Sequence, residues 1–253
     1  MWRPDISDLN AFYASHQGRL TRRILRRHIR ELWPDGSGLR VLGLGYAIPY
    51  LNLFRDEAER AIAVMPAQQG VVRWPREGAN RVALGEDDAL PLPDASFDRI
   101  LMVHALEGSE QIRPLLREVW RVLTPGGRLI VIVPNRVGLW ARHERSPFGH
   151  GISYTPGQLN RLLKSMTFMP LHWRGALYMP PWRWRMLQRS AMALERLGRR
   201  WGPGLAGVLI HEAGKQIYAM SPEPFRKRRV MPLPARYRLS APVKTPRLNR
   251  TDC

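Results

Sequence analysis

Residues 97–133 read FDRILMVHALEGSEQIRPLLREVWRVLTPGGRLIVIV. Short apolar runs stand at both ends of this segment, at 97–103 and 128–133, and an amphipathic stretch at 111–123 lies between them. Short, fully apolar runs predict strands that are covered on both faces of a sheet, and the stretch between them predicts a helix. The segment therefore predicts two parallel strands joined by a right-handed helical crossover.

The same alternation continues on both sides of this unit. Further short apolar runs precede it at 40–44, 61–65 and 81–84, with a helical stretch at 49–58. After it, Thr155 and Pro156 open an expected helix at 155–168, because threonine is a favoured N-cap and proline a favoured first helical residue. The last two strands are expected at 206–210 and 215–220, paired as a hairpin. This order predicts an α/β fold with a doubly wound, mostly parallel sheet.

The chain divides into three expected parts. Residues 1–37 hold one amphipathic helix, at 8–32, which is expected to pack on the domain and to leave an arginine-rich face outside. Residues 38–220 form the α/β domain, in which the Trp- and Arg-rich stretch 169–205 is expected to be a cap or lid. Residues 221–253 are rich in proline and arginine without periodicity, which predicts a mostly disordered basic tail.

Charge restricts the classes of function. Lysine and arginine number 40 against 21 aspartates and glutamates, which gives a formal net charge of +19. Such a charge indicates an anionic partner. However, 36 of the 40 basic residues are arginine, a bias that GC-rich coding also produces. Because no recognised nucleic-acid-binding module accompanies the charge, we do not expect nucleic acid as a partner.

Cysteine content and hydropathy point to a compartment. The single cysteine, Cys253, excludes a disulfide framework and a CxxC metal site, and no metal is expected. One cysteine also fits a reducing environment. The N-terminal residues include acids and no apolar core of a signal peptide, and no apolar run approaches the ~20 residues that a membrane span needs. We therefore expect a cytoplasmic protein.

The turn after the first expected strand is a candidate ligand site. In an open parallel sheet, ligands bind beyond the carboxyl ends of the strands. Residues 42–49 read LGLGYAIP, and the glycines Gly43 and Gly45 would let a ligand approach the backbone beside the next helix. A tight strand-to-helix turn would explain the two glycines equally well.

Two longer strings carry a resemblance to a known family. They are GEDDALPLPDASFD at 85–98 and LREVWRVLTPGGRL at 116–129. In this order and spacing they resemble the class I S-adenosylmethionine-dependent methyltransferases of the type 11 kind. The resemblance covers about residues 38–168, roughly half of the chain, and 211–219 fits the family's closing strand more loosely.

The resemblance implies a seven-stranded Rossmann-like sheet whose last strand is antiparallel, with S-adenosylmethionine lying over strands one to four. It also implies the site residues. The cofactor-binding positions carried over are Gly43, Gly45, Ala47, Met65, Glu86, Asp87 and His104. Among them, Met65 stands where the family has the acid that binds the ribose, and Glu86, with Asp87 beside it, where the family has the acid that accepts from adenine.

The sequence departs from the family at the cofactor loop. The usual acid is replaced by Gly43, later glycines are replaced by Ala47 and Pro49, and the ribose acid is replaced by Met65. Each missing hydrogen-bonding carboxylate would cost about 1.5–3 kcal/mol of binding. Two functions therefore remain open. One is S-adenosylmethionine-dependent methyl transfer to a small or lipid-like acceptor, and the other is a non-catalytic binding or regulatory module with a methyltransferase fold.

Catalysis would need few groups, because the sulfonium already activates the methyl group. Candidates for a general base are His104, in the loop after the fourth strand, and Tyr154, in the insertion after the fifth. The insertion's His143 and His150 are interpreted as solvated loop residues. The family uses an Asn/Asp-Pro-Pro-Tyr string after the fourth strand to methylate planar amide or base nitrogens. Residues 103–106 read VHAL instead, so the resemblance argues against that reaction.

The stretch 173–201 has three open interpretations. It mixes tryptophan, arginine and proline. This composition suits a helical cap on the sheet, a lid over the substrate, or peripheral contact with an anionic membrane surface, where tryptophan lies at the headgroups and arginine pairs with anionic lipid. A lipid or quinone-like acceptor would fit an amphipathic cap.

Overall fold

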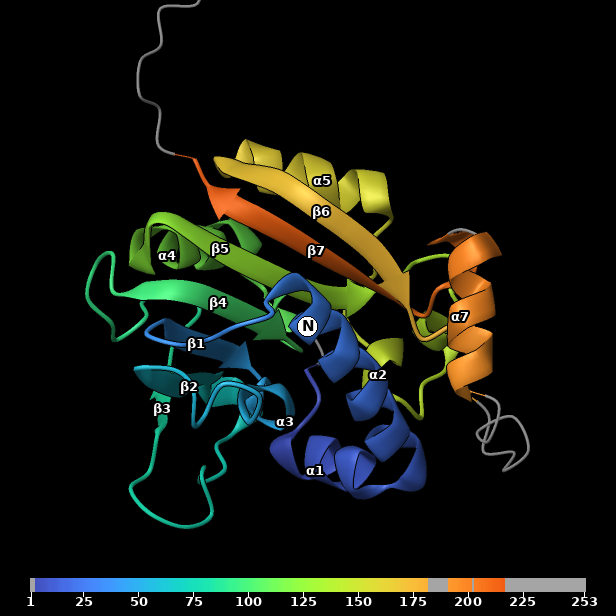
Figure 1. Cartoon of the computed structure of the whole chain (residues 1–253), viewed down its shortest axis with the longest axis horizontal. Coiled ribbons are helices and arrows are strands. Elements are labelled where there is room, and N and C mark those ends of the chain that lie inside the picture. Colours follow the sequence, from blue (N-terminus) through green and yellow to red (C-terminus); the bar gives the residue numbers. More distant parts are fainter. Residues whose placement is uncertain (1–2, 182–190, 202, 217–253) are drawn as a thin grey trace, which may run out of the picture. The chain divides into compact units, whose positions relative to one another are not determined.

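The computed structural model describes residues 3–181, 191–201 and 203–216. The tail predicted at 221–253 lies outside these residues. Figure 1 shows a central twisted sheet with helices on both faces. Within the described residues no helix is long and apolar enough to cross a bilayer.

Seven strands form the sheet, in the order β3-β2-β1-β4-β5-β7-β6. The first five pair in parallel, and β7 runs antiparallel to both β5 and β6. This confirms the predicted doubly wound, mostly parallel sheet. The strands are β1 (Arg40–Gly45), β2 (Arg60–Pro66), β3 (Val82–Gly85), β4 (Phe97–Val103), β5 (Leu123–Pro134), β6 (Phe168–Ala176) and β7 (Val208–Lys215).

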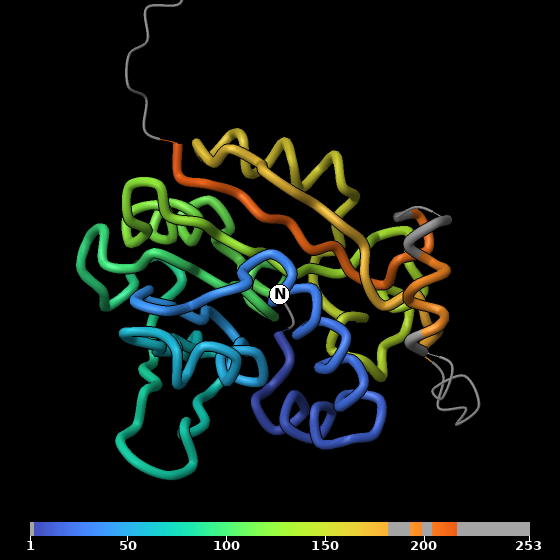
Figure 2. Tube along the Cα trace, viewed as in Figure 1, coloured from blue at the N-terminus to red at the C-terminus, as the bar shows by residue number. Residues whose placement is uncertain are grey.

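The last two strands differ from the predicted hairpin. Figure 2 shows β7 lying between β5 and β6, and β6 is the edge strand. The segment 212–214, expected as a turn, is part of the β7 ladder, where Gly214 pairs with Arg128 of β5. The first part of the stretch predicted as a cap, 169–205, is therefore the strand β6. Its composition is not that of a buried strand, because an edge strand leaves side chains such as Met169 and Trp173 half-exposed.

Helices cover the two faces of the sheet and enclose two apolar clusters. One cluster lies beneath α1 (Ile6–Ala14), α2 (His16–Leu32) and α3 (Ile48–Leu51), and the other beneath α4 (Ile112–Val122) and α5 (Pro156–Ser165). The predicted start of α5 is confirmed, because Thr155 and Gln158 form a reciprocal capping box. Helix α3 is shorter than the predicted 49–58, and turns follow it. Helix α7 (Ala191–Trp201) lies beside β6 and the η5 turn (Pro203–Leu205).

The N-terminal helix predicted at 8–32 is two helices. Ser15 separates α1 from α2, and its side chain accepts a hydrogen bond from the backbone N–H of Gly18 as the N-cap of α2. The helices meet closely at this corner, where a Cβ on Gly18 would lie 2.0 Å from the carbonyl oxygen of Phe12. The capping serine and the glycine therefore turn the chain, and α1 can reach the carboxyl ends of the strands.

Candidate active site

The turn after β1 is held against the end of β4. Gly45 has φ +71°, and a Cβ there would lie 2.5 Å from the carbonyl oxygen of Val103. The next residue, Tyr46, donates its backbone N–H to the same oxygen at 2.8 Å. Gly43 has a different reason to be glycine, because a Cβ there would meet the Leu51 side chain of α3 at 2.7 Å. Gly45 thus shapes the turn, while Gly43 serves the packing of α3.

The predicted positions Ala47 and Met65 are both fully buried in the apolar cluster beneath α1, α2 and α3. Side chains alternate along a strand, and Met65 turns its side chain into this core. Its neighbour Pro66 and the exposed Gln68 line a pocket beyond the end of β2. The side chain at the predicted ribose position is therefore withdrawn from the pocket.

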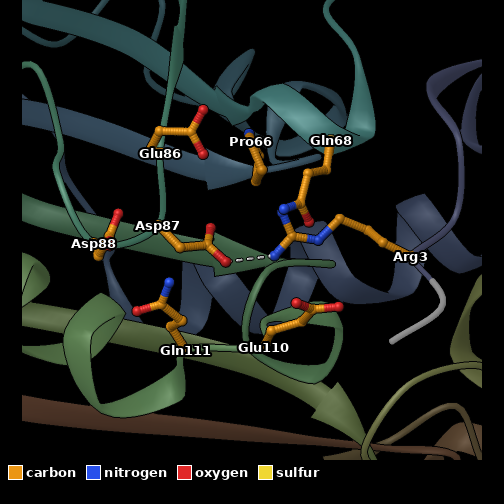
Figure 3. A pocket seen from close by; sticks show the side chains of 8 residues that line it. All are labelled: Arg3, Pro66, Gln68, Glu86, Asp87, Asp88, Glu110 and Gln111. Carbon is orange, nitrogen blue, oxygen red and sulfur yellow. Dashed lines mark hydrogen bonds and ion pairs between the residues drawn. The ribbon is translucent and has the colours of Figure 1, made fainter.

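This pocket opens at the carboxyl ends of β2 and β3, as Figure 3 shows. Its free space is about 40 Å³. Acidic side chains from the turn after β3 converge on it, together with residues from the N-terminal segment and from the start of α4. The lining residues are Arg3, Pro66, Gln68, Glu86, Asp87, Asp88, Glu110 and Gln111. The structure thus places Glu86 and Asp87, two of the predicted cofactor-binding residues, at the same pocket.

Arg3 is one of the pocket residues that the sequence analysis missed. Its Nη2 lies 2.7 Å from Oδ2 of Asp87, and its Nε donates to the carbonyl oxygen of Gly108 at 3.3 Å. The Arg3 side chain is only 4% exposed. Nothing in the sequence distinguishes this arginine from the other 35, because its partner lies 84 residues away.

A second group of polar side chains surrounds His104, directly after β4. The imidazole Nε2 lies 3.0 Å from Oη of Tyr13, and Nδ1 lies 3.2 Å from Oε1 of Glu107. The Tyr13 hydroxyl also lies 2.9 Å from that of Tyr50. All four side chains are buried. His104 has φ +52°, a conformation that is uncommon outside glycine and that concentrates at functional sites.

Glu107 and Tyr154 complete this group, and both have unused hydrogen-bonding capacity. Among the described residues, neither carboxylate oxygen of Glu107 accepts a well-aligned hydrogen bond, although Oε1 lies 3.2 Å from Nδ1 of His104. The hydroxyl of Tyr154 has no hydrogen-bond partner among the same residues. Burial, with the charge of Glu107 as a smaller cause, raises the pKa of the Tyr154 hydroxyl. Burial also raises the pKa of Tyr13, so both hydroxyls stay protonated at neutral pH. A buried carboxylate with so few donors is suited to a ligand that brings its own.

The two histidines of the later insertion stand apart from this group. His150 contacts the carbonyl oxygen of Glu144 in its own loop, and both His143 and His150 are partly exposed. The structure therefore brings together His104 and Tyr154 of the predicted catalytic candidates. Within the described residues no group of three or more His, Cys, Asp or Glu side chains could hold a metal ion.

Comparison with known proteins agrees with this architecture. Residues 41–131 match the methyltransferase domain family of the type 11 kind. A demethylmenaquinone methyltransferase of Deinococcus radiodurans is 33% identical over 142 residues, which are 55% of this chain and 53% of that protein. A ubiquinone/menaquinone biosynthesis C-methyltransferase of Rubrivivax gelatinosus is 28% identical over 133 residues, 51% of each chain. The matches therefore span about half the length of these curated relatives.

Solved structures share the fold. A methyltransferase from Thermotoga maritima superposes with a TM-score of 0.58 at 18% identity, over 83% of this chain and 96% of its own. A didemethyltoxoflavin methyltransferase from Burkholderia thailandensis, solved with S-adenosylhomocysteine, gives 0.53 at 18% identity, over 83% and 87%. The likeness to these structures shows a shared fold, and residues 41–131 of this chain match the type 11 methyltransferase domain family.

Proposed function

We propose that the chain is an S-adenosylmethionine-dependent methyltransferase. The observation that supports this most directly is the convergence of Glu86 and Asp87 on a pocket at the carboxyl ends of β2 and β3. This edge of the sheet is where doubly wound folds bind their ligands. The names of the relatives and the family of residues 41–131 support the same activity.

The chemistry of the lining residues fits the adenosine part of that cofactor. An adenine amino group and two ribose hydroxyls are hydrogen-bond donors, and the carboxylates of Glu86 and Asp87 and the amide of Gln68 accept. The Gly45 turn, where a side chain would collide with the end of β4, keeps the neighbouring backbone free of side chains. When bound, the cofactor supplies an electrophilic methyl group, which is the demanding part of the chemistry.

The group around His104 would handle the proton of the acceptor. The carboxylate of Glu107 favours a proton on Nδ1 of His104, which leaves Nε2 as an acceptor toward Tyr13. An acceptor hydroxyl that replaced the Tyr13 hydroxyl would donate to Nε2 and could lose its proton there. In this proposal His104 is the general base, Glu107 positions it, and Tyr154 binds the acceptor through its unpaired hydroxyl.

We further propose a small, lipid-like acceptor that carries an acidic hydroxyl group, such as a reduced quinone. The two relatives are named for quinone substrates. The site agrees with such a ring, because the buried Phe148 ring lies 4.6 Å from the His104 ring, centroid to centroid, and makes the surroundings of the base apolar. Deprotonation of a ring hydroxyl by His104 makes the ring carbon beside it nucleophilic, so this carbon can take the methyl group. The proton that this carbon carried then leaves to solvent, and the ring oxygen regains a proton, which restores the aromatic ring.

The alternative is a module that binds the cofactor or another ligand without catalysis. It is favoured by the burial of Met65 and by the occupation of Nε2 of His104 by Tyr13. Calorimetry with S-adenosylhomocysteine, followed by transfer of labelled methyl from S-adenosylmethionine to a reduced naphthoquinone, separates the cases. Binding and transfer that both weaken in Glu86→Ala support the enzyme. Binding without transfer to any hydroxylated ring supports the module, and no binding at millimolar ligand contradicts both cofactor proposals.

A further inference from the structure

We propose that Arg3 is a built-in competitor of the cofactor, which keeps the adenosine half of the cleft closed until the cofactor displaces it. This inference rests on the proposed function, since it takes S-adenosylmethionine to bind beyond the ends of β1 to β4. It assigns a role in cofactor entry to a residue that lies outside the region matched by the methyltransferase family, 41–131.

The Arg3 side chain joins the two loops between which an adenosine would lie. Its Nη2 pairs with Asp87 in the turn after β3, at 2.7 Å, and its Nε donates to Gly108 after β4, at 3.3 Å. Figure 3 shows the guanidinium lying across the pocket, between the amide of Gln68 and the carboxylate of Asp87. The contact with Gly108 is close, because a Cβ there would lie 3.1 Å from Nε of Arg3.

The space that remains beside Arg3 is too small for a purine. The pocket holds about 40 Å³, whereas a cavity of about 150 Å³ accommodates a single benzene ring. Because the Arg3 side chain is 4% exposed, it occupies the interior of the site and not its rim. An adenosine can therefore enter only after the guanidinium has moved.

The ion pair also uses an acceptor that the cofactor would need. Adenine and ribose offer neutral donors, whereas Arg3 offers an ionised one, and charge-assisted hydrogen bonds are the stronger kind. Asp87 is thus already bound to a better donor than the cofactor provides. The consequence is a conformational cost, because only molecules with Arg3 displaced can bind, and the apparent affinity falls by the competent fraction.

The displacement requires a short movement only. Asp5 is the N-cap of α1, and Leu9, Phe12 and Tyr13 anchor this helix in the core. Arg3 lies two residues before this cap, so its side chain can turn away from the pocket while Asp5 and α1 stay in place. Opening therefore breaks the two contacts of Arg3 without exposing the apolar cluster.

Stopped-flow binding of S-adenosylhomocysteine to the full chain tests the proposal. The variants Arg3→Met, which keeps an apolar stem, and Arg3→Ala should associate about 3–10-fold faster than wild type, with the dissociation rate unchanged. Arg3→Lys should stay close to wild type, because it keeps the charge. Arg117→Ala, which removes a charge from an exposed position of α4, is the matched control for the general effect of a lower positive charge and should also stay close to wild type.

Three results would overturn the inference. If Arg3→Met and Arg3→Ala bind at the wild-type rates, the side chain does not control entry. If they dissociate faster, Arg3 is a clamp that holds the cofactor and not a competitor. If wild type and all variants fail to bind while remaining folded, the proposed function fails as well. The first two results leave the proposed function intact, so the two failures are distinguishable.

Discussion

The hydroxyl of Tyr13 lies 3.0 Å from Nε2 of His104, which links the first helix of the chain to the loop after the fourth strand. On its other side, His104 faces Glu107 at 3.2 Å. The Nε2 atom of His104 therefore lies against a side chain of α1. In the proposed function an acceptor must displace the Tyr13 hydroxyl to reach this atom, which would couple proton transfer to the position of α1.

The first prediction concerns the buried side chains of His104 and Glu107. His104→Asn should lower kcat by about 10²–10⁴-fold, the usual contribution of a general base, and leave binding of S-adenosylhomocysteine unchanged. Glu107→Gln should lower kcat less and leave KM unchanged, because it acts through His104. Glu107→Asp should restore part of the loss. Steady-state assays with labelled cofactor and a reduced naphthoquinone measure kcat and KM of these variants. If substitutions of buried residues outside this group lower kcat equally, the losses reflect the fold and not a general base.

The second prediction compares two glycines with nearly the same backbone angle. Gly45 has φ +71° and Gly126 has φ +73°, so an alanine at either position pays about 1–2 kcal/mol for the left-handed conformation. At Gly126 nothing lies within 4 Å of the new Cβ, whereas at Gly45 it meets a carbonyl oxygen at 2.5 Å. Gly45→Ala should therefore cost at least ~3 kcal/mol. Urea denaturation measures both, and equal losses would show that the turn relaxes.

Most of the sheet could be predicted from the sequence, because strands buried on both faces appear as short apolar runs. The strand Phe97–Val103 is found where it was predicted, and β1, β2 and β3 differ from their predicted bounds by at most one residue at each end. The edge strand β6 could not be recognised, because its exposed Met169 and Trp173 give it no continuous apolar run. The hairpin prediction was wrong for the same reason. Because β6 was not recognised, both final strands were assigned to residues 206–220, where the described residues hold the single strand β7.

The site was partly predictable for a different reason. Glu86 and Asp87 lie in a string that resembles a family, so their place at the pocket could be carried over. Arg3 and Tyr13 contribute through contacts with residues 84 and 91 positions away, which no local sequence pattern predicts. The burial of Met65 could not be predicted from the sequence either, because methionine occurs both in apolar cores and in ligand pockets.

The third prediction concerns the missing ribose acid. Met65→Asp would place an unpaired carboxylate in a fully buried position and should destabilise the fold by about 3–5 kcal/mol. The exposed Gln68 lines the pocket, so Gln68→Ala should weaken S-adenosylhomocysteine binding by about 2–10-fold and leave the melting temperature unchanged. Calorimetry and thermal unfolding measure both. A stable Met65→Asp variant with tighter binding would show that the side chain reaches the ribose after all.

The fourth prediction follows from His211 in β7. Burial lowers the pKa of this imidazole from 6.5 to about 4, so the folded state holds it neutral. The unfolded chain binds the proton more readily, so His211 reduces stability as the pH falls from about 6.5 to about 4, by roughly 3 kcal/mol in total. Urea denaturation at pH 7.5 and 4.5 should therefore show a smaller acid loss in His211→Leu than in wild type. Equal losses in the two proteins would contradict the assignment.

The last prediction concerns contact with a membrane, for which the described residues offer a specific surface. Val137, Leu139 and Leu205 are 52%, 45% and 57% exposed. Their segments lie side by side, because Asn135 donates its backbone N–H to Gly207 at 3.0 Å and a Cβ on Gly138 would lie 2.2 Å from the carbonyl oxygen of Ala206. Exposed arginines, Arg136 and Arg142, stand in the same loop. Apolar side chains beside cations are the combination that anionic bilayer surfaces bind.

Sedimentation with vesicles tests this surface. Wild type should bind phosphatidylcholine vesicles that contain phosphatidylglycerol and bind pure phosphatidylcholine weakly, because the arginines need anionic lipid. The double variant Leu139→Gln with Leu205→Gln should bind about tenfold more weakly, since it removes two apolar side chains from the interface. The matched control is Val71→Gln with Leu84→Gln. It changes a residue in the loop after β2 and a residue of the edge strand β3, which are 46% and 48% exposed. If neither double variant loses binding, the arginines alone account for the attraction and this apolar surface does not enter the bilayer. If both lose binding equally, the loss is not specific to this surface, and the assignment of the contact to it is wrong.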